Sequence, residues 1–145
     1  MIDGVVITKL KQIKDNRGMV MHMLKRTDPV YRRFGEIYFS TVHPGIVKGW
    51  HLHKKMTLNY AVPYGKIRLV LFDDRKNSKT GGEVMELIVS PKNYRLVTVP
   101  PGIWNAFVGC GKTDSIVANC ATIPHDPGEI IRLDPDSGKI PYKWK

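Results

Sequence analysis

Short apolar segments separated by turn-forming residues run through almost the whole chain, and this pattern most constrains the fold. Segment 36–42 is rich in aromatic and β-branched residues, and segment 83–89 follows a period of two, as β-strands do. Gly, Pro, Asn and Asp separate the segments at roughly 8–12-residue spacing, and almost no stretch has a helical period. The pattern predicts an all-β sandwich or barrel.

The flanking turns place the individual segments. Asp-Asn-Arg-Gly at 15–18 predicts a hairpin-like turn before a strand at 19–24. A single helical turn is expected at 28–34, because Asp28 can cap it and Pro29 suits its first position. Further strands are expected at 4–7, 36–42, 48–53, 58–62, 66–72, 83–89, 94–99, 103–107 and 115–121, followed by a C-terminal tail rich in Pro, Asp and Gly.

Length and composition predict one domain that covers residues 1–145. A chain of 145 residues with 42% hydrophobic and 25% charged residues is typical of a single soluble domain. No stretch resembles a signal peptide or approaches the length of a membrane span, so we expect a cytoplasmic protein without a membrane partner. Cys110 and Cys120 are accordingly expected to be reduced thiols.

The net charge of +10 points to an anionic partner of some kind. The basic residues are spread along the chain and form no zinc-finger, Arg-Gly-Gly or recognition-helix pattern, so we expect no nucleic-acid partner. A small molecule that bears phosphate requires only a few of these charges.

Two histidines, His51 and His53, lie at alternate positions of one expected strand. Their side chains therefore point to the same face of the sheet. Two imidazoles on one interior face suit a metal site or a proton-transfer site, and a wet strand face is an equally simple interpretation.

A series of short motifs follows a recognisable order from about residue 15 to residue 144. In order they are Asp15-Asn16-Arg17-Gly18, Lys48-Gly49-Trp50-His51, Asp73-Asp74-Arg75 with the loop Ser78 to Gly82, Pro100-Pro101-Gly102, and Asp134-Pro135 with Ile140-Pro141-Tyr142-Lys143-Trp144. This order resembles the cupin-fold nucleotide-sugar epimerases typified by dTDP-4-dehydrorhamnose 3,5-epimerase.

The resemblance implies a cupin-type double-stranded β-helix, a jelly-roll barrel, and an isomerase that needs no cofactor or metal. The family inverts carbons beside the C4 ketone of a dTDP-linked 6-deoxy-4-ketohexose, for deoxysugars of surface polysaccharides. A base removes the proton α to the carbonyl, and an acid returns a proton to the other face. The family's base falls on His51, whose ordinary pKa suits the role, and the carboxylate that orients this base falls on Asp134.

The resemblance also implies substrate contacts and a homodimer whose subunits exchange N-terminal strands. Arg17 matches a ligand-contacting arginine, and Lys48 replaces the arginine that reaches the diphosphate, with loss of its two-pronged geometry. Asn105 replaces a histidine and keeps the capacity to hydrogen-bond, and Arg68 is expected to add positive charge at the mouth of the barrel.

Other positions depart from the family and make a full 3,5-epimerase doubtful. The catalytic tyrosine expected near Ile123-Pro124 is absent, and the lysine expected near the ketone oxygen is Leu58. A single-centre epimerase fits better. Candidates for the missing proton donor are Tyr60, Tyr38 and His53, with His125 as a weaker one.

Three rival interpretations remain open. Metal-dependent cupins have a glutamate and a third histidine in addition to His-x-His, where this chain has Thr57 or Leu58 and Asn105. The segment from His51 to Lys55 also resembles sugar 3,4-ketoisomerases of the same fold. The third interpretation is a sugar-nucleotide-binding cupin without catalysis.

Overall fold

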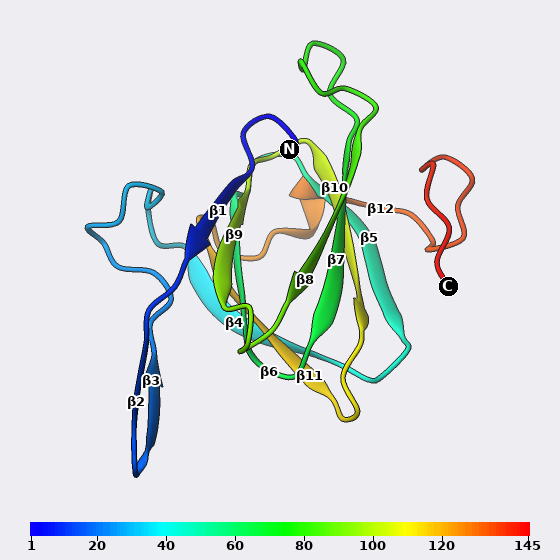
Figure 1. The fold of residues 1–145 in the computed structure, drawn as a ribbon. Coiled ribbons are helices and arrows are strands. Elements are labelled where there is room, and N and C mark those ends of the chain that lie inside the picture. The colour runs from blue at the N-terminus through cyan, green and yellow to red at the C-terminus, as the bar shows by residue number, and fades with distance from the viewer.

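Two five-stranded antiparallel sheets and a separate hairpin make up the computed structural model, which describes residues 1–145 (Figure 1). The first sheet has the order β1 (Val6–Lys9), β9 (Arg95–Val99), β6 (Leu58–Tyr64), β11 (Ser115–Ala121) and β4 (Glu36–Val42). The second has the order β12 (Ile130–Arg132), β5 (Val47–His53), β10 (Ile103–Gly109), β7 (Ile67–Asp73) and β8 (Val84–Val89). The all-β prediction is confirmed.

Alternation along the strands explains why the two sheets face each other. Ile67, Leu69 and Leu71 of β7 are fully buried in a core of 17 residues that lies between the sheets. The intervening Val70 and Phe72 lie on the outer face of the second sheet. Burial of these apolar side chains supplies the main favourable free energy of folding.

The C-terminal tail covers the outer face of the second sheet. Tyr142 and Trp144 pack against Trp50 of β5, with ring centroids 6.1 and 5.4 Å from that indole. The same cluster includes Phe72 and Trp104. Both faces of β5 are therefore packed, and its two histidines point to the inner side.

The first sheet is covered only in part. Met21 at the end of the hairpin, and Met23 and Leu24 just after it, pack against Tyr94 and its neighbours in β9 and β6. On β4, Ile37 and Phe39 remain exposed at 49% and 66%. This sheet therefore carries an uncovered apolar strip along its β4 edge.

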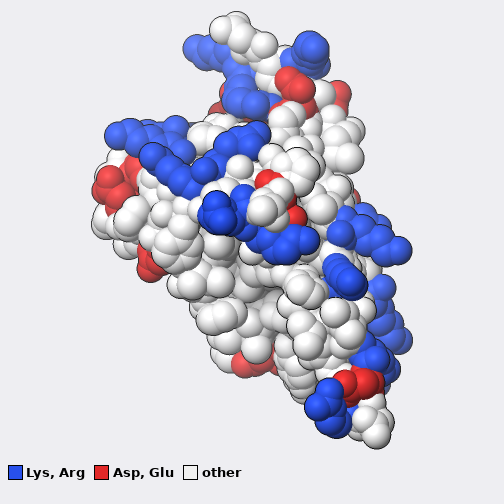
Figure 2. All heavy atoms as spheres, turned by 90° about the vertical axis from the view of Figure 1, so that its left-hand side faces the viewer, with Lys and Arg blue, Asp and Glu red and all other residues white.

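Strands β2 (Gln12–Asp15) and β3 (Gly18–Met21) form a hairpin that stands away from the barrel (Figure 1). Arg17 lies in its turn and pairs with Asp15 at 2.7 Å. Figure 2 shows that lysine and arginine outnumber acidic residues on the face that carries this hairpin. No helix of the chain is long and apolar enough to cross a membrane.

Two expectations about local structure were wrong. Residues 28–30 form a turn and residues 31–34 have no regular structure, because the Asp28 carboxylate accepts a hydrogen bond from the preceding Lys25 N–H and does not cap a following helical turn. The short helical turn is η1 (Pro127–Glu129), where Asp126 caps Gly128 N–H and Pro127 takes the first position. The C-terminal segment also contains β12, which pairs with β5 through Arg132 and His51.

Candidate active site

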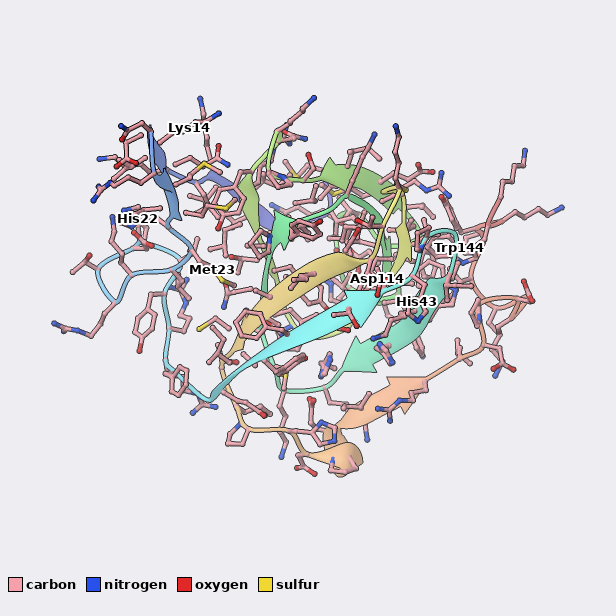
Figure 3. The ribbon with its side chains drawn as sticks, turned by 90° about the horizontal axis from the view of Figure 1, so that it is seen from below. Lys14, His22, Met23, His43, Asp114 and Trp144 are labelled. Atoms are coloured by element: carbon pink, nitrogen blue, oxygen red, sulfur yellow. The ribbon has the colours of Figure 1, made fainter.

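A cavity of about 300 Å³ opens between β4 of the first sheet and β5 and β12 of the second. Three of the chain's five histidines line it. The other two lie outside it: His22 follows the hairpin, and His43 pairs with Asp114 at 2.7 Å (Figure 3). The lining residues are Glu36 and Tyr38 of β4, His51 and His53 of β5, Ile130 and Arg132 of β12, and His125.

The His51 ring has no hydrogen-bonded carboxylate, in contrast to His53 on the same strand. Burial lowers its pKa to about 4, and the positive charge of Arg132, His53 and Lys48 acts in the same direction. The ring is therefore neutral near neutral pH, which is the form that accepts a proton.

His53 has a different environment two residues along the same strand. Its Nδ1–H donates to Oε1 of Glu129, which is only 2% exposed. The second carboxylate oxygen of Glu129 accepts from the N–H groups of Lys55 and Met56, at 3.0 and 3.2 Å. This arrangement fixes the tautomer of His53 and leaves Nε2 as the nitrogen that can interact with a ligand.

The two candidate tyrosines have different surroundings. The Tyr60 hydroxyl donates to Oδ1 of Asn105 at 2.9 Å, and Nδ2 of Asn105 donates to the backbone carbonyl of His51. Tyr60 is thus part of the core between the two sheets and does not line the cavity. Tyr38 does line it, and its hydroxyl oxygen accepts a hydrogen bond from Asn119 at 2.8 Å.

Asp134 and His51 line a second hollow together with Gly49 and Arg132. The backbone groups of Trp50 and the adjacent Leu133 exchange hydrogen bonds, which hold this segment against β5. No hydrogen bond joins Asp134 to His51 in this structure, so the predicted orientation of His51 by Asp134 stays a prediction.

The predicted substrate-binding residues are dispersed. Lys48 belongs to β5 and extends toward β4, where its ammonium donates to Oγ of Ser40 at 2.6 Å. Arg68 lies on the outer face of the second sheet, opposite to His51, where its guanidinium carbon is 5.9 Å from the Trp144 ring centroid. Arg17 stands in the hairpin turn, away from the barrel (Figure 1). The structure therefore brings Lys48, but neither arginine, near the cavity.

Gly49 allows the close approach of β5 to β10 beside His51. Its φ is +140°, and a Cβ atom there would lie 2.4 Å from Cβ of Ala106. A side chain at this position would push the two strands apart or distort the backbone that carries His51. The packing of the two strands thus requires glycine at position 49, two residues before His51.

Four residues of the site were missed in the sequence: Glu36, Asn119, Glu129 and Arg132. Glu129 and Arg132 belong to the tail in which no strand was expected, and Asn119 lies within a segment recognised only as a strand. Glu36 opens β4 and accepts a hydrogen bond from the backbone N–H of His125. No feature of the sequence around Glu36 indicated this contact, because it joins residues far apart in the chain.

Two further observations concern other possible sites. No group of three or more His, Cys, Asp or Glu side chains lies close enough together to hold a metal ion. A larger cavity of about 750 Å³ lies within residues 135–144 of the tail, and no histidine lines it. The cavity between β4 and β5 is the one that brings three histidines together with a tyrosine.

Comparisons of the sequence and of the structure with known proteins indicate the same family. The sequence model described as dTDP-4-dehydrorhamnose 3,5-epimerase matches residues 1–145. A dTDP sugar isomerase from Desulfovibrio desulfuricans G20 superposes with a TM-score of 0.96 at 43% identity, over 99% of this chain and 92% of that one.

Two curated relatives are 30% identical to the chain. The spore coat polysaccharide biosynthesis protein SpsL of Bacillus subtilis aligns over 98% of this chain and 91% of its own length. The probable low-salt glycan biosynthesis epimerase Agl13 of Haloferax volcanii aligns over 97% and 88%. With its jelly-roll sheets and the match along its whole length, the chain belongs to the dTDP-4-dehydrorhamnose 3,5-epimerase family of cupin-fold isomerases.

Proposed function

We propose that this protein inverts one carbon beside the ketone of a nucleotide-linked 4-keto-6-deoxyhexose, with His51 as the base. The observation that carries this proposal is a neutral histidine at a cavity that also holds Tyr38, His53 and Arg132. Proton transfer at a carbon α to a carbonyl requires such a base and a group that stabilises the enolate.

The reaction begins when an unprotonated nitrogen of His51 removes the α proton. The electrons of the broken C–H bond form the enolate, whose negative charge the guanidinium of Arg132 stabilises across the same cavity. Return of a proton to the opposite face of that carbon restores the ketone with inverted configuration. Asp134 stabilises the imidazolium of His51 once this has formed.

A nucleoside diphosphate is the expected carrier of the sugar. The relative from D. desulfuricans is named a dTDP sugar isomerase, and the net charge of +10 favours an anionic ligand. Lys48, beside the cavity, is the expected contact for a phosphate. Asn105 of the neighbouring strand β10 holds the backbone of His51 by donating to its carbonyl. Arg68 is excluded from this role by its place on the other sheet face.

We infer a homodimer in which the hairpin of one subunit reaches the other. The apolar side chains Ile13, Met19 and Val20 of the hairpin are exposed, as is the strip of Ile37 and Phe39 on β4. Isolated two-stranded hairpins are only marginally stable, and exposed apolar patches often form interfaces. Arg17 then contacts the nucleotide bound to the partner subunit, which explains why it lies far from its own cavity.

We assign the reaction to the cytoplasm and to the supply of an unusual deoxysugar for a surface polysaccharide or glycan. Cys110 and Cys120 are free thiols, which suits a reducing compartment. SpsL and Agl13 are named for polysaccharide and glycan biosynthesis, respectively.

Proton NMR of dTDP-4-keto-6-deoxyglucose incubated with the protein in D₂O tests the proposal. We expect loss of the C3 or C5 proton signal with the wild type and no loss with His51→Ala. Exchange that continues in His51→Ala, or a substrate spectrum unchanged by the wild type despite binding, would refute the base assignment.

A 3,4-ketoisomerase is the second candidate. His51 and His53 lie on the same face of β5, which favours this reaction. From there both side chains reach the same side of a flat enediol. Removal of the proton from C3, its return to C4 and transfer of the hydroxyl proton from O3 to O4 then convert the 4-ketone into a 3-ketone through the enediol. Carbon-13 NMR of the same mixture distinguishes the two, because the ketone carbon moves from C4 to C3 only in the second.

A further inference from the structure

We propose that Tyr38 is the proton donor of the inversion and that Asn119 is its positioning residue. This inference rests on the proposed function, since it supplies the acid that must act opposite His51. The family's own tyrosine is missing near residues 123–124, and the structure contains another phenol at the cavity.

Tyr38 and His51 line the cavity from opposite sheets, and this is the first argument for the assignment. Tyr38 belongs to β4, at the edge of the first sheet, whereas His51 belongs to β5 of the second sheet. A flat enolate held between these sheets presents one face to each. Inversion requires removal and return of the proton on different faces, and these two residues satisfy that requirement. His53 shares the strand face of His51 and reaches the same face as the base.

The second argument is the direction of the hydrogen bond to the phenol. The backbone N–H of Asn59 can only donate, so the amide atom that it contacts at 2.9 Å is Oδ1 of Asn119. Nδ2 of Asn119 therefore faces Tyr38 and donates to its hydroxyl oxygen. Because that oxygen acts as the acceptor there, the phenolic hydrogen is left to point elsewhere, and the cavity is the adjacent space.

A buried series of side chains fixes this direction across the first sheet. Thr98 Oγ1 donates to Oδ1 of Asn59 at 2.8 Å, and Nδ2 of Asn59 donates to the carbonyl of Cys120 at 3.0 Å. Asn59 and Asn119 are 2% and 0% exposed. Every amide group in the series has a partner, so rotation of Asn119 would leave buried polar atoms unsatisfied.

The third argument is the protonation state of the phenol. Burial raises the pKa of Tyr38, the bond from Asn119 lowers it, and the charges of Glu36 and Glu129 raise it further, with a net rise. Tyr38 therefore keeps its proton at neutral pH. In the step, the O–H bond breaks as the new C–H bond forms, the enolate returns to the ketone, and the phenolate recovers a proton from water.

The test compares two measurements on Tyr38→Phe with dTDP-4-keto-6-deoxyglucose in D₂O: deuterium exchange at the reacting carbon and formation of the inverted product. His51 still removes and returns a hydron on one face, so we expect exchange to persist. Inversion should fall about 100-fold or more, the range for loss of a general acid. His51→Ala should lose both, and if it keeps exchange then the proposed function itself fails.

Three other variants sharpen the result. Tyr94→Phe removes another buried phenol, outside the cavity, and should leave the ratio of inversion to exchange at the wild-type value. Asn119→Ser should lower that ratio about 10-fold, whereas a purely structural role would reduce both rates equally. Unchanged inversion in Tyr38→Phe, loss of exchange as well as inversion in that variant, or selective loss of inversion in His53→Gln instead, would overturn the assignment.

Discussion

Replacement of Glu129 by glutamine tests a buried carboxylate with little change of shape. The carboxylate accepts from Nδ1–H of His53 and from the N–H groups of Lys55 and Met56. Burial raises the pKa of Glu129, but these hydrogen bonds outweigh burial and hold it below the ordinary value. The charged form of Glu129 therefore stabilises the folded state.

The magnitude follows from the groups that lose a partner. Glutamine keeps an oxygen for the two backbone N–H groups and turns its own N–H₂ toward His53, so the charge-assisted bond is lost. Such a bond contributes about 1.5–3 kcal/mol, so we expect Glu129→Gln to lower the free energy of unfolding by about 2–3 kcal/mol. Glu129→Ala leaves all three donors unpaired and should cost about 3–5 kcal/mol.

Urea denaturation followed by tryptophan fluorescence measures both variants. Because the folded pKa of Glu129 is lowered from 4.5, its contribution is complete above pH about 4.5 and decreases as the pH falls through the folded value. The difference between wild type and Glu129→Gln should therefore shrink in acid. Glu83→Gln, at an exposed position, is the control and should change stability by less than about 0.5 kcal/mol.

A Glu129→Gln variant that is as stable as the control, or a difference that does not change with pH, would refute this reasoning. It would mean that desolvation of the carboxylate cancels its three hydrogen bonds.

Three further predictions concern other residues. With the pKa of His51 lowered to about 4, kcat/KM should stay flat as the pH falls from neutral to about 5.5 and decline toward pH 4; a decline centred near 6.5 in the pH profile would contradict this. Gly49→Ala should lower the free energy of unfolding by roughly 2–4 kcal/mol in urea, because its Cβ overlaps Ala106 at a positive φ, and an undiminished value would contradict the packing argument. Asp73→Asn should cost about 2–4 kcal/mol by the same measurement, because its buried carboxylate accepts bonds from Arg75 that hold its pKa well below the usual range; equal stability would show that these bonds contribute nothing.

The strands could be predicted because their signal is local. For β4 and β11, the short segments bounded by turn-forming residues predicted the observed limits, 36–42 and 115–121. The helical turn was misplaced because Asp-Pro occurs both at 28–29 and at 126–127, and the sequence alone does not say which aspartate caps a turn. Strand β12 is only three residues long, so it is too short to show a period of two although Ile130 and Ile131 favour β structure, and it is held by its pairing with β5.

The site residues that could be predicted are those given by the alternation of side chains along a strand and by the family motifs. His51 and His53 share the inner face of β5, as their spacing indicates. Alternation along β7 also places Arg68 on the outer face of the sheet. That placement requires knowing that Ile67, Leu69 and Leu71 form the core, which the sequence alone does not tell. The pairs His53–Glu129 and Tyr38–Asn119 join residues 76 and 81 positions apart, and no spacing rule connects such residues.

The packing of the C-terminal tail on the back of β5 has a consequence for the order in which the protein matures during synthesis. Trp50 finds Tyr142 and Trp144 only after nearly the whole chain has been made, and β5 gains its edge partner β12 at almost the same time. Domains can begin to fold from the N-terminus on the ribosome. In this chain β5, which carries His51, lacks its outer layer until residues 142–144 have been made, so the other strands can pair before the surroundings of His51 are complete.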